Sequence, residues 1–417
     1  MAFDYDWVIV GSGFGGSVSA LRLSEKGYKV AVVEVGRRFE DKDFAETAWN
    51  LRRYFWMPRI GLRGILRMSP FKDVFVVSGS GVGGGSLGYA NTLYRPLPGF
   101  YKDPQWNGMA DWEVELGRHY VTAERMLGVT LYRDEGPADK LLHEYARETG
   151  ADGTYSNTQV GVYFGEEGVT VKDPFFGGEG PDRTGCKKCG SCMVGCRHGA
   201  KNTLVKNYLY FAEKLVAEVI HATQVQEILP LGASDGSEGY ELKTQRSGVT
   251  IRKNKARLTA RGAIVSAGPL GTNRLLADCL HTGALPNISE RLGYVVRTNS
   301  EAFTAVLQPP GGVDVTDGAT IDGILAERDV VLALSMFGPE ALDRPVADVM
   351  STEVVTCRLD TTVEELMATM TERRARHVPV VVDGHLAGVV SIGDVVKNRI
   401  GELEFERDQL DSYVHQT

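Results

Sequence analysis

The first forty residues constrain the fold of this chain more than any other segment. An apolar run at 7–10 enters the glycine-rich turn 11–16, and a second apolar run at 30–33 ends at an acidic residue. Strand, glycine turn, helix and acidic strand end, in this order, are typical of the βαβ unit that binds dinucleotides. The glycines permit a tight bend, close approach of a pyrophosphate and close packing of the helix, whose N-terminus offers N–H groups to phosphate. The residues predicted to make these contacts are Gly11, Gly13, Phe14, Gly15, Gly16 and Glu34.

Two later segments repeat the pattern of an apolar strand followed by glycines. The strand at 74–77 runs into a loop with five glycines in the seven positions 79–85, which suits a backbone that approaches a flat ligand closely. Tyr89 follows this loop and favours an ordered segment over a flexible surface loop. The apolar run 263–267 leads into another glycine turn, and such a late strand commonly returns the chain to the nucleotide-binding sheet. The residues expected to face a ligand here are Gly81, Gly84, Gly85, Ser86, Asn91 and Gly268.

Composition excludes several kinds of protein. The 417 residues suffice for two or three domains, and 24% charged with 43% apolar residues are typical of a globular protein. No apolar stretch reaches the roughly 18 residues of a transmembrane segment, and the chain starts with a strand instead of a charged leader. We therefore expect a cytoplasmic protein. Its net charge of −8 gives no indication of nucleic acid as a partner.

Charge is distributed unevenly along the chain. Residues 311–417 hold 20 acidic and 9 basic side chains, whereas residues 1–310 carry a small basic excess. The Gln-Pro-Pro-Gly-Gly segment at 308–312 separates the two parts, and no helix would cross it. The sequence therefore predicts two regions of different character.

Four of the six cysteines lie within eleven residues, at Cys186, Cys189, Cys192 and Cys196. In a chain without an export signal such a cluster indicates metal or redox chemistry more than disulfide bonds. The spacing is that of bacterial ferredoxins, although Arg197 stands where those proteins have proline. Zinc ribbons separate their cysteine pairs by longer intervals. We expect either an iron–sulfur cluster or a reduced cysteine-rich loop here, with His198 and Lys201 serving loop structure.

Four separated motifs occur in an order that resembles the glucose–methanol–choline (GMC) flavoprotein oxidoreductases, and in particular their cholesterol oxidase-like branch. They are the turn 11–16 with Glu34, Gly-Val-Gly-Gly-Gly-Ser-Leu at 81–87, Cys-x2-Cys-Gly-x-Cys-x2-Gly-Cys-x2-Gly-Ala-Lys at 186–201, and Ser-Ala-Gly-x-x-Gly-Thr at 266–272. The resemblance covers about residues 1–303. It implies FAD, with the pyrophosphate on the first glycines, a ribose on Glu34 and the isoalloxazine ring near 81–91. The reaction it implies is hydride removal from the carbon of an alcohol or sterol.

Part of the family's pattern has no match in this sequence. In GMC oxidoreductases the catalytic histidine, an asparagine partner and a closing flavin-binding strand lie in the C-terminal half. Nothing after Ser300 matches them, and His377, His385 and His415 each stand in a different sequence context. Hydride removal from an alcohol needs a proton acceptor. We therefore assign no catalytic residue and expect a flavin-binding part without the family's catalytic half.

A second α/β pattern follows residue 313. A strand at 354–357 leads to Thr361-x-x-Glu364, a capping box that opens a helix, and apolar residues at 363, 366, 367 and 370 form one stripe. Strands at 377–382 and 386–390 are separated by Asp-Gly-His, a hairpin signal. An acidic amphipathic helix is expected from about Gly393.

This order of elements resembles a CBS domain. Residues 344–400 supply one full repeat, and residues 313–334, in which 317–325 is expected to be a turn that leads into a strand, resemble the tail of a preceding repeat. The resemblance implies that Ser391 and Asp394 contact the ribose of an adenine nucleotide. CBS repeats work in pairs, so half a partner leaves apolar surface exposed. We therefore expect either a homodimer formed through this module or a module of low stability. The alternative to nucleotide binding is a folded module that packs without binding a ligand.

The sequence predicts an α/β protein with an FAD-binding Rossmann-like domain, an irregular insertion and a C-terminal CBS-type module. The expected boundaries are 1–100 with 200–303 for the FAD-binding domain, 101–199 for the insertion with the cysteine cluster, 304–312 for the junction and 313–417 for a partial CBS pair. The leading hypothesis for function is an FAD-dependent oxidoreductase acting on CH–OH groups. An adenine-nucleotide-sensing regulatory protein and an iron–sulfur electron-transfer protein are the alternatives.

Overall fold

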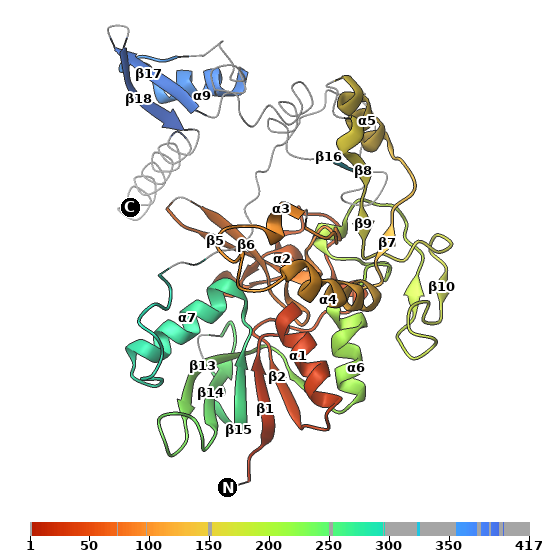
Figure 1. The fold of residues 1–417 in the computed structure, drawn as a ribbon, viewed down its shortest axis with the longest axis vertical. Helices are drawn as coiled ribbons and strands as arrows, with labels where there is room; N and C mark the ends of the chain where they lie inside the picture. Colours follow the sequence, from red (N-terminus) through yellow and green to blue (C-terminus); the bar gives the residue numbers. More distant parts are fainter. Residues whose placement is uncertain are drawn as a thin grey trace, which may run out of the picture. The chain divides into compact units, whose positions relative to one another are not determined.

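The computed structural model describes residues 2–72, 74–96, 98–148, 152–249, 253–294, 296, 323–325, 356–372, 377–382, 385–391 and 395. The chain divides into two compact units, one of Met1–Pro70 with Phe75–Val331 and one of Phe71–Val74 with Leu332–Thr417. Both units combine helices with strands, which confirms the predicted α/β class (Figure 1). Within the described ranges, no helix has both the length and the apolar character that a membrane span requires.

The first unit is built on a six-stranded sheet in the order β12-β2-β1-β15-β14-β13. Its strands are β1 (Tyr5–Val10), β2 (Val30–Val33), β12 (Glu218–Ile220), β13 (Thr223–Pro230), β14 (Tyr240–Arg246) and β15 (Ala256–Val265). β1 pairs in parallel with β2 and β15, whereas β14 pairs antiparallel with both of its neighbours. The late apolar strand thus returns to the nucleotide-binding sheet, as predicted.

The apolar residues of the central strands divide between the two faces of this sheet. Three helices cover the sheet: α1 (Phe14–Ser24), α6 (Tyr208–Lys214) and α7 (Gly268–His281). Ile9 belongs to the core formed with α1 and α6, whereas Val8 and Val10 belong to the core formed with α7. Figure 1 shows α1 and α6 on one side of the strands and α7 on the other. A parallel strand covered on both faces needs apolar residues throughout, which explains the unbroken run at 7–10.

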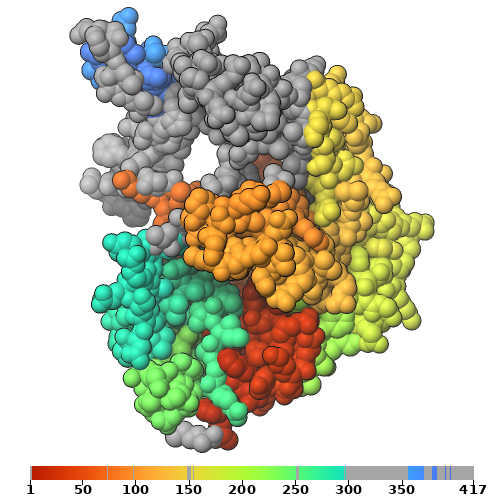
Figure 2. Space-filling view, viewed as in Figure 1, coloured from red at the N-terminus to blue at the C-terminus, as the bar shows by residue number. Residues whose placement is uncertain are grey.

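Short elements fill the chain between β2 and β12. They are α2 (Leu51–Tyr54), β3 (Trp56–Met57), β4 (Leu62–Arg63), β5 (Leu66–Pro70), β6 (Phe75–Gly79), α3 (Pro98–Tyr101), α4 (Trp112–Met126), β7 (Thr130–Leu131), α5 (Pro137–Glu148), β8 (Tyr155–Asn157), β9 (Gln159–Val160), β10 (Thr170–Val171) and β11 (Arg183–Thr184). The strand expected at 74–77 is β6, which pairs with β5 outside the main sheet. In Figure 2 the orange segment that contains α3 and α4 lies at the surface next to α1.

The second unit contains α9 (Val363–Glu372) and a hairpin of β17 (His377–Val382) and β18 (His385–Ser391). The predicted helix and hairpin are confirmed, but the predicted capping box is one residue too early. Thr362 N donates to Glu365 Oε2 at 3.0 Å, and Glu365 N donates to Thr362 Oγ1 at 3.2 Å. Thr-x-x-Glu occurs in both frames, but the Thr361 hydroxyl instead accepts a hydrogen bond from Arg358 N at 3.0 Å, before the helix starts.

The helix of this second unit packs its apolar stripe against the hairpin. Leu366 and Met370 share a core with Val378 and Val380, whereas Met367, predicted for the same stripe, is 38% exposed. The strand expected within 317–325 is β16 (Gly323–Leu325), which pairs antiparallel with β8 in the first unit. The helix expected from Gly393 lies outside the described residues except for Val395.

The loop 173–180 of the first unit is organised by the carboxylate of Asp173. Its two oxygens accept hydrogen bonds from the backbone N–H groups of Phe175, Phe176, Gly178 and Gly180 at 2.9–3.1 Å. Burial alone would raise the pKa of this carboxyl group, but the four N–H groups outweigh burial and lower the pKa below its usual value.

We expect Asp173→Asn to lower the free energy of unfolding by about 2 kcal/mol at neutral pH, because a charged acceptor is lost. The lowered pKa makes this stabilisation complete above the unfolded pKa of about 4, and it is lost as the pH falls through the folded pKa. Urea unfolding of both proteins at neutral pH and at about pH 3 should show a smaller difference at the lower pH. The exposed Asp235, which accepts from Ser237 N, provides the control Asp235→Asn. An undiminished difference in acid would contradict the prediction.

Candidate functional site

The first glycine turn joins β1 to α1. Its glycines Gly11, Gly13 and Gly16 have different surroundings. Gly11 has φ +100°, and a Cβ there would lie 2.5 Å from the carbonyl oxygen of Ser266. A Cβ on Gly16 would overlap the carbonyl oxygen of Gly11. A Cβ on Gly13 would meet nothing within 4 Å. Gly11 and Gly16 are therefore required by packing, whereas Gly13 borders open space at the N-terminus of α1.

Glu34 lies at the end of β2 and is 5% exposed. Its Oε2 accepts hydrogen bonds from the backbone N–H of Ser12 at 3.1 Å and from the Ser12 hydroxyl at 2.7 Å. Its Oε1 accepts from Gly36 N at 2.8 Å and from Gly81 N at 3.4 Å. The carboxylate thus ties the first glycine turn to the second glycine loop. Ser12 was not selected from the sequence, although it is the one hydroxyl among the glycines of the turn 11–16.

The second glycine loop packs directly on the first. Its 3-10 turn η3 (Gly84–Leu87) brings Gly84 so close that a Cβ there would lie 2.7 Å from Gly13 Cα. The buried Ser86 hydroxyl donates to Gly83 O at 2.7 Å and accepts from Leu204 N at 3.0 Å. The side chain of Ser86 therefore holds the loop in place.

Two predicted residues of this region, Gly85 and Gly81, differ in the space around them. A Cβ on Gly85 would meet only Phe14 Cε2, at 4.0 Å, whereas one on Gly81 would lie 2.8 Å from a methyl group of Leu87. Phe14 is 40% exposed and makes an edge-to-face contact with Tyr89 at 6.1 Å between ring centroids. Gly85 and Phe14 thus border open space, and Gly81 is packed.

Asn91 is fully buried and has φ +71°. Neither its side-chain nitrogen nor its side-chain oxygen has a hydrogen-bond partner among the described residues. Asparagine is one of the residues that tolerate this left-handed backbone conformation. Buried polar groups are nearly always hydrogen-bonded in native proteins, so an unpaired buried amide indicates a missing partner.

The third glycine turn lies against the first. Ser266 N donates to Val10 O at 2.9 Å, and the Ser266 hydroxyl lies 3.2 Å from Gly11 O. Gly268 begins α7 with φ +73°, and a Cβ there would meet nothing within 4 Å. A Cβ added to Gly15 would lie 3.8 Å from Ser266 Cβ. The structure therefore brings the three predicted glycine segments together.

Arg67, in β5, is a charged residue near these turns that the sequence analysis did not select. Burial lowers the pKa of its guanidinium, the charge of Glu34 acts in the opposite direction, and Arg274 adds to the lowering. A partly buried cation thus lies within electrostatic reach of Glu34. No sequence pattern distinguishes Arg67, because it is one of several basic residues in its segment.

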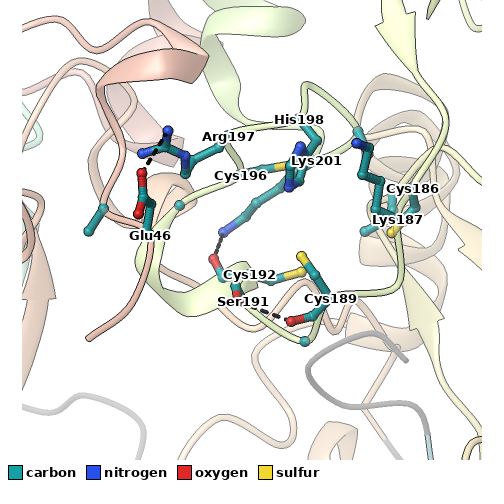
Figure 3. A pocket seen from close by; sticks show the side chains of 15 residues that line it. Glu46, Cys186, Lys187, Cys189, Ser191, Cys192, Cys196, Arg197, His198 and Lys201 are labelled. Atoms are coloured by element: carbon teal, nitrogen blue, oxygen red, sulfur yellow. Dashed lines mark hydrogen bonds and ion pairs between the residues drawn. The ribbon is translucent and has the colours of Figure 1, made fainter. Parts of the chain in front are cut away.

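The four clustered cysteines line a cavity of about 260 Å³ (Figure 3). Cys189 is exposed, Cys192 is buried, and Cys186 and Cys196 are partly buried, and none of these four described residues is in a disulfide. Among the described residues, which include all four, no group of three or more His, Cys, Asp or Glu side chains is placed to hold a metal ion. The predicted iron–sulfur site therefore finds no support, and neither does the electron-transfer hypothesis that depends on it. Spacing along the chain does not determine where the sulfurs point, and burial raises the pKa of the Cys186 thiol to about 12.

Lys201 connects this cysteine loop to the second glycine loop. Its side chain is buried, and Nζ donates to the carbonyl oxygens of Leu87 at 3.0 Å, Tyr89 at 2.7 Å and Cys192 at 2.9 Å. Burial lowers the pKa of this amine to about 7. Lys201 therefore serves loop structure, as expected. Burial, followed by the charges of Lys187 and Arg197, lowers the pKa of His198.

In the second unit, Ser391 is the last residue of β18. Asp394, its predicted companion in nucleotide binding, lies outside the described residues. The structure therefore describes only one of the two residues that were predicted to contact a nucleotide, and this residue lies at the end of the hairpin.

The parallel strands, the glycine turns and the buried Glu34 define a Rossmann-like dinucleotide-binding fold in the first unit. Comparison with protein families agrees: residues 9–39 match the NAD(P)-binding Rossmann-like domain, residues 180–292 match GMC oxidoreductases and residues 346–401 match the CBS domain. The chain therefore carries the N-terminal domain of a GMC oxidoreductase together with a CBS domain. GMC oxidoreductases bind FAD.

Similar individual proteins support both assignments. A cholesterol oxidase of Mycobacterium tuberculosis (strain ATCC 25618 / H37Rv) is 49% identical over 326 residues, which cover 76% of this chain and 56% of that protein. A cholesterol oxidase of Acinetobacter baumannii is 48% identical over 324 residues, which cover 76% of this chain and 58% of that protein. The mitochondrial CBS domain-containing protein CBSX3 of Arabidopsis thaliana is 36% identical over 94 residues, which cover 22% of this chain and 46% of that protein. The chain thus spans about half the length of these relatives.

Proposed function

We propose that the first unit binds FAD in the space bordered by the three glycine turns, and that the chain is a GMC-type oxidoreductase acting on the CH–OH group of an alcohol or sterol. The observation that carries the proposal is the buried amide of Asn91, which has no partner among the described residues. A bound molecule would supply that partner. Gly13 and Gly268, where an added Cβ would meet nothing within 4 Å, leave room for it.

The residues of the site have distinct roles toward this cofactor. Gly13 and the N-terminus of α1 would hold the pyrophosphate, because unpaired N–H groups and the helix dipole favour an anion. Glu34 already accepts four hydrogen bonds, so a ribose hydroxyl would replace the longest, from Gly81 N at 3.4 Å. Gly85, Phe14 and Asn91 would border the isoalloxazine ring. FAD supplies the hydride acceptor that alcohol oxidation requires.

The substrate class follows from the relatives. Two cholesterol oxidases are 48–49% identical to this chain across 76% of its length. A sterol or another alcohol is therefore the proposed substrate. We assign no catalytic residue, since no histidine after Ser300 stands in the context that the family requires.

FAD binding is tested on the purified full-length protein, which should be yellow and release FAD on denaturation. Gly13→Ala should weaken FAD binding about 100-fold, equivalent to roughly 2.7 kcal/mol, because a methyl group would occupy the path of the pyrophosphate. Its fold should persist, since nothing lies within 4 Å of the added Cβ. Gly117→Ala is the matched control, because an added Cβ on this residue in α4 also meets nothing within 4 Å.

Each outcome of this experiment decides one part of the proposal. Folded wild-type protein that takes up no FAD would overturn it, and wild-type affinity in Gly13→Ala would place the pyrophosphate elsewhere. Anaerobic addition of a sterol or a primary alcohol to the FAD-loaded protein should bleach the flavin absorbance. Flavin that stays oxidised with every alcohol would refute the oxidoreductase activity and leave FAD binding intact.

A second function is proposed for the CBS domain, on the observation that residues 346–401 match this domain and that its hairpin ends at Ser391. We expect AMP or ATP, but not a guanine nucleotide, to raise the melting temperature of the full chain. Ser391→Ala should remove that shift, because the hydroxyl would no longer meet the ribose. The absence of any shift would overturn nucleotide binding, and light scattering on the same samples tests the predicted homodimer.

A further inference from the structure

The cysteine loop contains four described cysteines, none of them in a disulfide, that neither proposed function uses. The Cys-x-x-Cys spacing typical of dithiols that alternate between reduced and disulfide forms occurs twice, at Cys186 with Cys189 and at Cys189 with Cys192. Cys192 begins the 3-10 turn η5 (Cys192–Val194), and the Ser191 hydroxyl donates to Cys189 O at 3.0 Å, so the two residues flank one compact bend. In the view of Figure 3 the side chains of Cys189 and Cys192 lie next to each other among the residues that line the cavity, whereas Cys186 lies apart from them.

The four thiols differ in their ability to react. The thiolate is the nucleophile in thiol–disulfide exchange, so a reactive cysteine must be both accessible and able to lose its proton. Cys189 is exposed, and Cys192, which also lines the cavity, is buried. Burial raises the pKa of Cys186 to about 12, so this thiol is a poorer first nucleophile than an exposed one. Cys189 is therefore the thiol that an external reagent meets first.

The cavity favours a reagent with negative charge. Lys187, Arg197 and the Lys201 amine line it, and Glu46 is the one carboxylate among its lining residues. Arg197 Nη2 lies 3.2 Å from Glu46 Oε1, so this pair largely neutralises itself and Lys187 remains the positive charge available to a ligand.

We propose that Cys189 and Cys192 form a redox dithiol that a small disulfide carrying carboxylates oxidises. The Cys189 thiolate attacks one sulfur of the small disulfide, the disulfide bond breaks, and one small thiolate leaves. The Cys192 thiolate then attacks the Cys189 sulfur of the mixed disulfide and releases the second small thiolate. Two protein thiols are oxidised, one small disulfide is reduced to two small thiols, and the two protons pass from the protein thiols to the released thiolates.

Lys201 links this dithiol to the second glycine loop. An effect of the disulfide on FAD binding follows from this link, and it rests on the proposed FAD site. Lys201 Nζ holds the Cys192 carbonyl oxygen at 2.9 Å together with the carbonyl oxygens of Leu87 and Tyr89. A disulfide restricts the separation of its two Cβ atoms, so the bridge constrains the backbone at Cys192, whose carbonyl oxygen Lys201 holds. We expect this constraint to act through Lys201 on the glycine loop, so that the oxidised protein binds FAD more weakly than the reduced protein.

The test uses the full chain, reduced and freed of reductant, and treated with oxidised glutathione. Alkylation and peptide mass spectrometry should find a disulfide between Cys189 and Cys192. In Cys192→Ser the reaction should stop at a glutathione adduct on Cys189, and in Cys189→Ser neither product should form. The matched control Cys196→Ser, in the same loop, should form the bridge like wild type. A bridge that uses Cys186 or Cys196, or thiols that stay reduced in the folded wild-type protein, would overturn the proposal.

Two further measurements separate the charge argument and the coupling from the exchange itself. Hydroxyethyl disulfide, which lacks carboxylates, should react more slowly than oxidised glutathione relative to a free cysteine peptide, and equal relative rates would overturn the preference for an anion. FAD titration of the reduced and bridged proteins should give a higher Kd for the bridged form, and equal values would overturn the coupling. A chain that binds no FAD in either form refutes the proposed function while the dithiol result stands.

Discussion

Gly16→Ala is expected to lower the free energy of unfolding of the first unit by about 4 kcal/mol, a large fraction of the stability of a typical domain. A Cβ at this position would overlap the Gly11 carbonyl oxygen and lie 2.8 Å from Ser266 Oγ. The overlapped atom belongs to the backbone, so no side-chain rotation relieves the contact. Moving α1 away would instead open the core that contains Ala20 and Ile9, both fully buried.

Urea unfolding followed by circular dichroism measures this loss, with Gly15→Ala as the matched control. A Cβ on Gly15, one residue earlier in the same helix, would meet only Ser266 Cβ at 3.8 Å, which is an ordinary van der Waals distance. The control should therefore retain wild-type stability within about 1 kcal/mol. A Gly16→Ala protein as stable as the control would show that α1 does not pack on the turn as described.

Lys201→Met is expected to destabilise the first unit by about 3 kcal/mol and to weaken FAD binding as well. Methionine has a similar length, but it leaves the carbonyl oxygens of Leu87, Tyr89 and Cys192 without the donor that they share. Each buried polar group left unpaired costs roughly 1–3 kcal/mol. The loss falls on the two loops that Lys201 joins, one of which borders the proposed cofactor site.

Thermal and urea unfolding measure the first effect, and FAD titration measures the second. The control Lys214→Met removes a lysine whose ion pair with Glu179, at 3.0 Å, is exposed to solvent. Exposed ion pairs contribute about 0–1 kcal/mol, so the control should be close to wild type. Equal stability of the two variants would contradict the structural role of Lys201. Normal FAD binding in a destabilised Lys201→Met protein would separate the loop from the cofactor site.

Local patterns predicted most of the elements that form the site. The apolar runs at 7–10 and 30–33, the glycines between them and Glu34 form β1, α1 and β2 as expected, because each depends on neighbours within a few residues. The same reasoning located the hairpin at Ser391. It failed by one residue at the capping box, since Thr361 and Thr362 each satisfy the Thr-x-x-Glu pattern and only the start of α9 chooses between them.

The cysteine cluster shows where a sequence pattern stops being informative. Its spacing matches the ligand spacing of an iron–sulfur cluster. Among the described residues, however, no three His, Cys, Asp or Glu side chains lie close enough together to hold a metal ion. Whether the four sulfur atoms converge depends on the path of the loop around the cavity. Contacts with residues far away in the sequence determine that path. Phe44, for example, accepts a hydrogen bond from Arg197 through its carbonyl oxygen at 2.9 Å, across 153 positions of sequence.

By itself, the sequence determined that this chain has a dinucleotide-binding βαβ unit, that its later glycine segments resemble those of GMC oxidoreductases and that a CBS domain follows. The tertiary structure alone decided how the three glycine turns meet. Glu34 bonds to Ser12 and Gly81, Ser266 packs on Gly11, and Lys201 joins loops that lie over one hundred residues apart. These contacts follow from the packing of α1, α6 and α7 on one sheet, and no spacing within a segment encodes which buried donor will reach which distant acceptor.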